Sequence, residues 1–116
     1  MHEIGLMQTA LEAALNQAQT QGVTHINRVT LCVGEATGAM HEVLQMGFAA
    51  LIQNTLAEGA TLAIEPVPVL CFCSACQIEF TPARADDLYY ECPQCNRFET
   101  QVRQGRDLYV GALEVN

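Results

Sequence analysis

Two cysteine pairs decide how the chain folds: Cys73-Ser74-Ala75-Cys76 and Cys92-Pro93-Gln94-Cys95, with fifteen residues between them. In each pair two residues separate the thiols, so one tight turn directs both sulfur atoms at the same ion. The spacer is long enough to fold back and complete a tetrahedron around that ion. The spacing alone therefore predicts a zinc site, with two disulfides or a thioredoxin-like redox pair as the alternatives.

Length and composition predict one small globular domain with a metal module. The chain has 116 residues, of which 50% are hydrophobic and 16% are charged, as is typical of a packed globule. The sequence that starts with Met1-His2-Glu3 lacks the basic and apolar segments of a secretory signal peptide. No apolar stretch reaches the roughly 18 residues that span a bilayer. We therefore expect a cytoplasmic protein without a membrane partner, in a compartment where thiols stay reduced and bind metal.

The net charge argues against a nucleic-acid partner. It is −8 at pH 7, and four thiolates around one Zn²⁺ would make the folded chain more acidic still. Nucleic-acid binding needs clustered Lys and Arg, and the whole chain has only five of these residues. RNA contact stays open as a minor alternative because four arginines lie in or beside the cysteine module: Arg84, Arg97, Arg103 and Arg106.

Hydrophobic periodicity predicts two helices and three strands. Apolar residues at intervals of three and four predict helices over 4–21 and 39–57, with Gly22 ending the first. Alternating patterns predict strands over 26–34 and 61–65, and the closing strand 108–115 is rich in β-favouring residues. Cys32, in the first strand, has no second ligand at chelating spacing, so we expect a core residue.

These elements predict an α+β fold. Two helices pack on a small mixed β-sheet, and a zinc-ribbon-like module of four cysteines is inserted before the last strand. Pro66 and Pro68 form a stiff lead into that module. The predicted domains are 1–68 with 105–116 for the α/β part and 69–104 for the zinc module, and the strand order stays open.

The N-terminus is a second candidate metal site. The Met1 amine, the His2 amide nitrogen and the His2 imidazole are joined by short covalent links, so they can close chelate rings without a folded pocket. Such nitrogen-rich planar ligation suits Ni(II) or Cu(II), whereas thiolates suit zinc. Taken alone, a histidine at position 2 is more often part of a solvated terminus.

Several motifs together resemble the HypA/HybF family of nickel metallochaperones, and the resemblance covers nearly the whole chain. They are Met1-His2-Glu3-Ile4, Val33-Gly34-Glu35-Ala36-Thr37-Gly38, Leu62-Ala63-Ile64-Glu65-Pro66-Val67-Pro68, the paired C-x-x-C motifs, and Gly111-Ala112-Leu113-Glu114-Val115.

The resemblance implies binding and transfer of a metal ion without catalysis. Ni(II) would bind at the Met1 amine, His2 and Glu3, while structural zinc would be held by Cys73, Cys76, Cys92 and Cys95. The nickel would pass to [NiFe]-hydrogenase, through its large subunit, or in some bacteria to urease, with a GTPase partner. A homodimer stays open. The alternatives are a rubredoxin-like electron carrier and a zinc-ribbon module that binds a partner.

The chain also departs from the family pattern. Gln77 and Asn96 follow the C-x-x-C pairs where glycine is common, and a left-handed Gln77 would cost roughly 1–2 kcal/mol. We therefore expect the first turn to bend differently or to be more labile. Three further residues lie outside the family pattern: Cys71, His25 and His41. Cys71 is interpreted as a spare thiol, with exchange into the metal site or oxidation as the alternatives. His25 and His41 are interpreted as surface residues, and a bridging role of His41 in an oligomer stays open. His41 belongs to a second Met-His-Glu that lacks a free amine.

Overall fold

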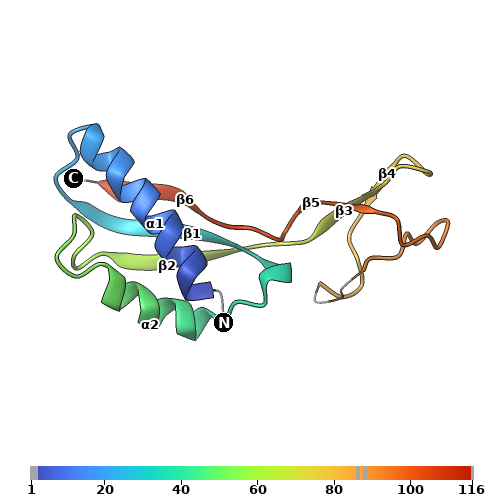
Figure 1. The fold of residues 1–116 in the computed structure, drawn as a ribbon, viewed down its shortest axis with the longest axis horizontal. Coiled ribbons are helices and arrows are strands. Elements are labelled where there is room, and N and C mark those ends of the chain that lie inside the picture. The colour runs from blue at the N-terminus through green and yellow to red at the C-terminus, as the bar shows by residue number, and fades with distance from the viewer. Residues whose placement is uncertain (1–2, 86, 88, 116) are drawn as a thin grey trace. The chain divides into compact units, whose positions relative to one another are not determined.

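The structure is a computed structural model that describes residues 3–85, 87 and 89–115. It contains two α-helices and two three-stranded sheets, ordered β2-β1-β6 and β4-β3-β5 (Figure 1). This confirms an α+β fold with two helices, small mixed sheets and a separate cysteine module. The elements are α1 (Glu3–Thr20), β1 (Ile26–Gly34), a 3₁₀ turn (Glu35–Thr37), α2 (His41–Leu51), β2 (Thr61–Val67), β3 (Leu70–Cys73), β4 (Ile78–Phe80), β5 (Gln101–Gln104) and β6 (Leu108–Val115).

The chain separates into two compact units. The helical unit comprises Met1–Cys32, Ala39–Glu65 and Leu108–Asn116, and the cysteine unit comprises Val33–Gly38 and Pro66–Asp107. The domain boundaries expected from the sequence stay a prediction, because contacts within a folded chain do not show which parts fold independently. Within the described part of the chain, neither helix is long and apolar enough to cross a membrane.

Helix α1 ends where the sequence predicts, at a left-handed glycine. Its buried residues Met7, Leu11 and Ala18 lie on one face. Gly22 has φ +84°, which lets its N–H bond the Gln19 carbonyl at 3.0 Å, while the Val23 N–H bonds the Ala18 carbonyl at 3.0 Å. These two bonds form a Schellman motif, which satisfies carbonyls that the helix itself leaves unpaired.

Helix α2 packs on α1 through a glycine. A Cβ at Gly47 would collide with Ile4 Cδ1 and would lie 3.1 Å from Met7 Cε. The missing side chain therefore allows the two helices to approach closely at this point. Leu44 and Phe48, on the same helix, are buried in the core of the helical unit.

Helix α2 is shorter than the predicted 39–57, because side chains after Leu51 bond the backbone in a competing way. The Thr55 hydroxyl donates to the Ile52 carbonyl at 2.6 Å and accepts the Ala57 N–H at 3.1 Å. Asn54 adopts φ +63°, and its N–H donates to the Glu58 carboxylate at 2.9 Å. Threonine and asparagine favour such local turns over helix continuation.

Strand β1 forms the middle of the helical unit's sheet. The predicted alternation holds at its start, where Arg28 is exposed and Val29 is buried, but every residue from Leu31 onward is buried. Cys32 is a core residue, as predicted: a Cβ on Gly111 would lie 2.6 Å from its sulfur atom. Burial of each large side chain stabilises the fold by about 1.5–3 kcal/mol. Other buried residues of this unit are Ile26, Ile52, Ala57 and Leu62.

The cysteine unit contains a small antiparallel sheet that the sequence did not reveal. Strand β3 pairs with β4 in the register Cys71 to Phe80 and Cys73 to Ile78, and it pairs with β5 on its other side. These strands are three or four residues long, too short for a periodic pattern. The buried cluster of this unit is Val69, Cys71, Cys73, Phe80, Tyr90 and Cys92.

Backbone segments cross closely at two glycines of the cysteine unit. A Cβ at Gly34 would collide with the backbone of Gly105, and one at Gly105 would lie 2.6 Å from Val69 Cα. Gly105 also has φ +102°, which L side chains rarely adopt. The crossing is closed by hydrogen bonds of 2.8 Å from Gly34 N to Asp107 O and from Ala36 N to Gly105 O.

We expect Gly105→Ala to lower the free energy of unfolding of the metal-loaded protein by about 1–3 kcal/mol more than Gly38→Ala. Gly38 is the matched control, since it belongs to the same unit and has φ +69°, with no atom within 4 Å of the position that an added methyl group would take. Chemical denaturation followed by circular dichroism measures the difference. If the two variants lose equal free energy of unfolding, the positive φ of Gly105, and not the close backbone crossing, explains why this position needs glycine.

Candidate metal centre

The first cysteine pair lies at the end of β3 and in the turn to β4. Cys73 is the last residue of β3, and Cys76 precedes a residue with left-handed backbone, Gln77, at φ 56°. The Gln77 side-chain amide donates to the Ser74 carbonyl at 2.7 Å. The left-handed turn is thus formed in spite of the missing glycine, which leaves the greater lability of this turn as the prediction.

The second cysteine pair forms an equivalent turn without a flanking strand. Asn96 has φ 63°, and its N–H bonds the Cys92 carbonyl at 2.9 Å. The Cys92 N–H in turn bonds the Arg97 carbonyl at 2.8 Å. Asparagine tolerates the left-handed region, so this turn has the geometry that the sequence predicts.

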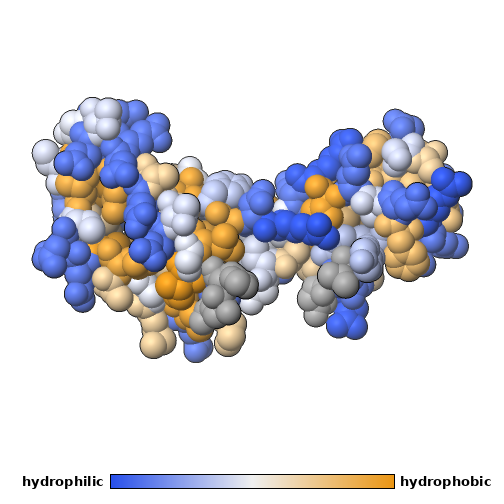
Figure 2. All heavy atoms as spheres, viewed as in Figure 1, coloured by the Kyte–Doolittle hydropathy of each residue, from blue (hydrophilic) through white to orange (hydrophobic). Residues whose placement is uncertain are grey.

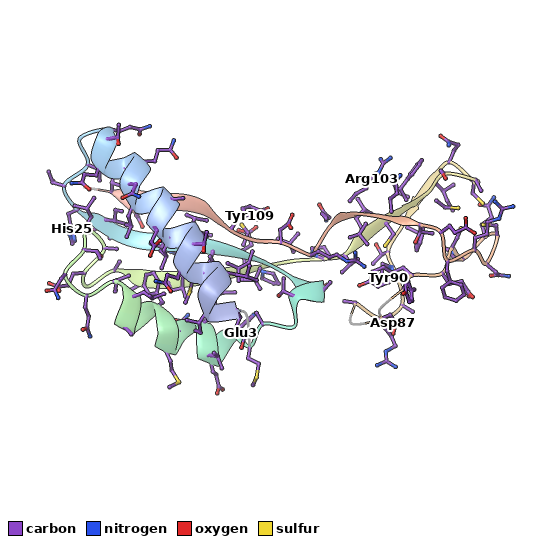
Figure 3. The ribbon with its side chains drawn as sticks, in the orientation of Figure 1. Glu3, His25, Asp87, Tyr90, Arg103 and Tyr109 are labelled. Carbon is purple, nitrogen blue, oxygen red and sulfur yellow. The ribbon has the colours of Figure 1, made fainter. Side chains whose placement is uncertain are left out.

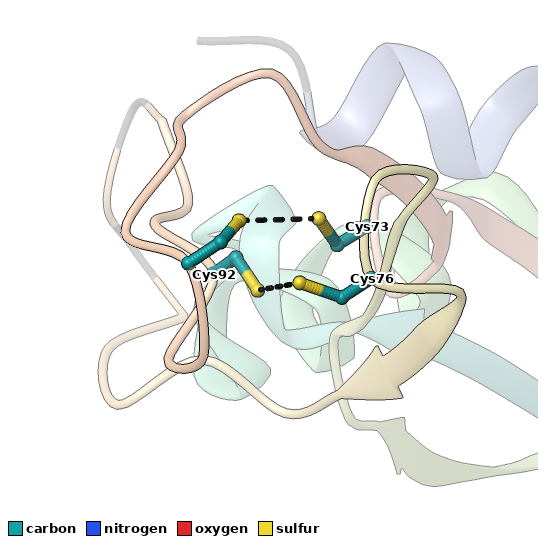
Figure 4. A group of neighbouring side chains, drawn as sticks. Cys73, Cys76 and Cys92 are labelled. Carbon is teal, nitrogen blue, oxygen red and sulfur yellow. Dashed lines mark hydrogen bonds between the residues drawn. The ribbon is translucent and has the colours of Figure 1, made fainter.

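The two turns bring all four sulfur atoms together. They lie within 4.8 Å of one another, with 3.6 Å between Cys73 and Cys95 and 4.0 Å between Cys92 and Cys76 (Figure 4). A tetrahedral ion with metal–sulfur bonds of about 2.3 Å separates its sulfur ligands by about 3.8 Å, so the arrangement fits such an ion. The distances exceed the roughly 2.0 Å of a disulfide bond, and all four cysteines are free.

The cysteine thiols of the cluster differ in pKa, and therefore in how easily each forms a thiolate. Hydrogen bonding to Cys95, together with burial and bonds to the other thiols, raises the pKa of Cys76 to about 12. Burial also acts to raise the pKa of Cys92, but the backbone N–H groups of Cys95 and Gln94 outweigh it, and the pKa falls to about 7. The backbone of the turn Cys92-Pro93-Gln94-Cys95 therefore favours the thiolate form of Cys92, an effect that the sequence spacing did not reveal.

Cys71 is close to Cys73 in the sequence but lies outside the cluster of four cysteines. Its side chain is fully buried in the core of the cysteine unit, beside Phe80 across the sheet. Burial raises the pKa of Cys71, and the charge of Arg106 opposes this rise. A buried, protonated thiol behaves as a small apolar side chain, which agrees with the interpretation of Cys71 as a spare thiol.

Arginines of this unit contact its own aromatic and acidic residues. The Arg103 guanidinium lies 3.9 Å from the centre of the Phe72 ring and 3.1 Å from the Glu79 carboxylate (Figure 3). Arg106 lies 5.6 Å from the Tyr90 ring, and Arg84 pairs with Asp87 at 3.7 Å. The contacts of Arg103 join β5 to β3 and β4, and the acidic partners of Arg103 and Arg84 partly neutralise charges that a nucleic acid would need.

The predicted nickel ligands are only partly within the described residues. Met1 and His2 lie outside them, whereas Glu3 is the half-buried first residue of α1. Figure 3 places Glu3 and His25 at opposite ends of the helical unit, so His25 is not near the start of α1. His41 is exposed at the start of α2. Among the residues that the structure describes, only the four cysteines gather at chelating distance.

The fold and the site define the class of protein: a small α+β protein with a module in which four cysteines gather at metal-binding distance. A model of the family described as "Hydrogenase/urease nickel incorporation, metallochaperone, hypA" matches residues 1–115. The chain belongs to this HypA family of metallochaperones, as the sequence motifs indicate.

Relatives of similar length support the assignment. The hydrogenase maturation factor HypA of Picosynechococcus sp. is 38% identical over 99% of both chains. That of Lawsonia intracellularis is 34% identical over the same share of each chain. The solution structure of the Ni metallochaperone HypA from Helicobacter pylori has a TM-score of 0.73 and 24% identity, and it covers 99% of this chain and 97% of its own. This last comparison shows the shared fold.

The side chain at position 77 tests how the first turn is stabilised. We expect Gln77→Ala to be less stable than Gln77→Gly by about 1–2 kcal/mol, because only glycine adopts a positive φ without strain. The native glutamine should lie between the two, since its bond to Ser74 offsets part of the strain. Denaturation of the three metal-loaded proteins measures the order. An alanine variant as stable as the glycine variant would contradict the strained turn.

Proposed function

We propose that this protein binds Ni(II) at its N-terminus and delivers it during maturation of [NiFe]-hydrogenase. The observation that carries the proposal is the match of residues 1–115 to a nickel-incorporation family, in a chain that begins Met1-His2-Glu3. The proposed ligands are the Met1 amine, His2 and Glu3. Delivery to urease is a second candidate, supported by the same family description.

The start of α1 supports a chelate at this position. Glu3 is the first helical residue, and the first N–H groups of a helix have no acceptor within the helix. The Glu3 backbone nitrogen is thus not needed for the helical hydrogen bonds, which supports its proposed role beside the terminal amine. Ni(II) binding requires a neutral amine and imidazole and at least one deprotonated amide, so affinity should fall as the pH falls.

A chelate at a chain terminus also suits transfer of the ion to a partner. Its ligands can leave one at a time as a partner's ligands replace them, so the ion is never released to water. The four-thiolate cluster lacks this property, since a closed tetrahedral site keeps no open position. We assign the cluster, Cys73, Cys76, Cys92 and Cys95, to structural zinc, because soft thiolates in tetrahedral geometry favour zinc.

Substitution of a ligand separates a zinc site from the rubredoxin-like alternative. We expect Cys76→Ala to lose bound zinc and the folded cysteine unit, because three thiolates leave the ion exposed to water and chelators. Cys71→Ala is the matched control and should keep one zinc per chain, since Cys71 lies outside the cluster. Elemental analysis and absorption of the purified proteins give the readout. A red protein that contains iron would favour electron transfer.

Replacement of His2 tests the nickel site directly. We expect His2→Ala to abolish stoichiometric Ni(II) binding, because the chelate loses its imidazole, while the zinc content and the circular dichroism stay unchanged. Acetylation of the Met1 amine should have the same effect. Absorption titration of the untagged proteins with Ni(II) measures both.

The chain supplies its own control for this experiment. Met40-His41-Glu42 repeats the sequence of the N-terminus but has no free amine, so His41→Ala should bind Ni(II) like the native protein. Stoichiometric nickel in His2→Ala, or loss of nickel only in His41→Ala, would refute the N-terminal site.

The family and the charge of the chain also suggest its partners and its location. We infer a role in the cytoplasm, with a GTPase and the hydrogenase large subunit as protein partners and without catalysis, nucleic acid or membrane binding. The contacts of Arg103 and Arg84 with acidic residues support the exclusion of RNA. A titration of the purified GTPase against the nickel-loaded protein tests the first partner, and absence of binding would refute it.

A further inference from the structure

The first turn of α1 meets α2 at a glycine. A Cβ at Gly47 would collide with Ile4 Cδ1 and would lie 3.1 Å from Met7 Cε. Ile4 and Met7 are three residues apart, so they lie on the same face of α1 in consecutive turns. Their side chains therefore occupy the place that a side chain at position 47 would take.

Helix α2 itself does not require a glycine at this position. Glycine lowers the stability of a helix interior relative to alanine, and alanine does occur in the same helix, at Ala49 and Ala50. Gly47 is also not among the glycines with a positive φ. The missing Cβ is thus explained by the close approach of Ile4.

The first turn of α1 has little else to anchor it. Gly5 has no side chain, and no atom lies within 4 Å of the position that an added Cβ would take. Leu6 is 47% exposed, and Glu3 is half-buried. The first N–H groups of a helix lack acceptors within it, so hydrogen bonds hold this turn weakly. Ile4 is the apolar side chain through which the turn packs on α2.

The contact between the two helices is apolar. Figure 1 shows the start of α1 crossing α2, and Figure 3 shows Glu3 at this end of α1. In Figure 2, hydrophobic residues of the helical unit reach the surface between hydrophilic ones. Neither helix contains Lys or Arg, so no lysine or arginine of the helix pair can hold the Glu3 carboxylate. The position of Glu3 therefore depends on the packing of its turn.

We propose that Ile4, packed on Gly47, is a positioning residue for nickel. This inference rests on the proposed nickel site of Met1, His2 and Glu3, because Ile4 directly follows the last of these residues. The terminal amine and the His2 nitrogens close their chelate rings through covalent links and need no fold. Glu3 joins them only when the first turn of α1 is held in place, and fixing a ligand in advance lowers the entropic cost of binding.

Gly47→Ala tests the proposal because the added methyl group displaces Ile4. We expect Ni(II) to bind this variant about 10- to 100-fold more weakly than the native protein, as is typical when a group that orients a metal ligand is lost. Binding should not be abolished, in contrast to His2→Ala, since the amine and His2 remain. Absorption titration of the untagged, zinc-loaded proteins measures the affinity, and circular dichroism with zinc content verifies the fold.

The absorption spectrum of the bound nickel separates positioning from a general loss of stability. A synthetic peptide, Met-His-Glu-Ile with an amidated C-terminus, carries the same ligands without the helix. Ni(II) bound to Gly47→Ala should have a spectrum close to that of the peptide complex. The native protein should bind Ni(II) more tightly than the peptide and with a different spectrum, because α1 then holds Glu3.

A second substitution should rescue the variant. Ile4→Val removes the Cδ1 atom with which the added Cβ collides, and the Cγ1 atom that remains lies 3.6 Å from it, an ordinary contact distance. The double variant with Ile4→Val and Gly47→Ala should therefore recover most of the native affinity and the native spectrum.

Gly111→Ala is the matched control for stability. Its Cβ would lie 2.6 Å from Cys32 Sγ in the same unit, beside the second half of α1 and not its first turn. This variant should lose stability but bind Ni(II) like the native protein. Native affinity in Gly47→Ala overturns the proposal, as does equal weakening by Gly111→Ala or a native protein that matches the peptide. Each of these results leaves the nickel site intact, whereas stoichiometric nickel in His2→Ala would refute the site itself.

Discussion

Four sulfur atoms held within 4.8 Å of one another are the constraint on which the cysteine unit depends. Three of the six residues in its buried cluster are cysteines, so the apolar core alone is small. Hydrogen bonding to Cys95 and the other thiols raises the pKa of Cys76, whereas the backbone N–H groups of Cys95 and Gln94 lower the pKa of Cys92. A metal ion bound by thiolates displaces the thiol protons, and its binding free energy becomes folding free energy for the unit.

The backbone around the cluster is shaped to meet this constraint. Left-handed residues after each cysteine pair, Gln77 and Asn96, turn the chain so that both sulfur atoms of a pair point the same way. The β3-β4-β5 sheet and the glycine crossing at Gly34 and Gly105 then hold one turn against the other segments of the unit. Backbone strain at Gln77 and the close backbone approach at Gly34 and Gly105 thus belong to the same unit that brings the four sulfur atoms together.

The sequence predicts those features whose causes are local. Helix α1, its stop at Gly22, β1, β6 and the gathering of the four cysteines follow from periodicity, a left-handed glycine and the spacing of cysteines. Three features depend on information that one segment does not contain. The sheet of β3, β4 and β5 arises from pairing between short segments. The crossing of Gly34 with Gly105 joins residues that are far apart in the sequence. Helix α2 ends at Leu51 because the side chains of Thr55 and Glu58 form hydrogen bonds with the backbone. His2, on which the nickel proposal depends, lies outside the described residues and stays a prediction.

The two proposed metals follow from two kinds of ligand. Soft thiolates in a closed tetrahedron favour zinc and resist exchange, whereas an amine, an imidazole and amide nitrogens at a chain terminus favour the planar geometry of Ni(II). Nitrogen donors bind Cu(II) at least as tightly as Ni(II), so the terminal chelate cannot select nickel by affinity alone. Selection must then come from the metal that is available and from the partner that receives it. In the proposed function the two parts of the chain thus differ: the cysteine unit would keep its zinc, and the terminus would carry an ion that a partner receives.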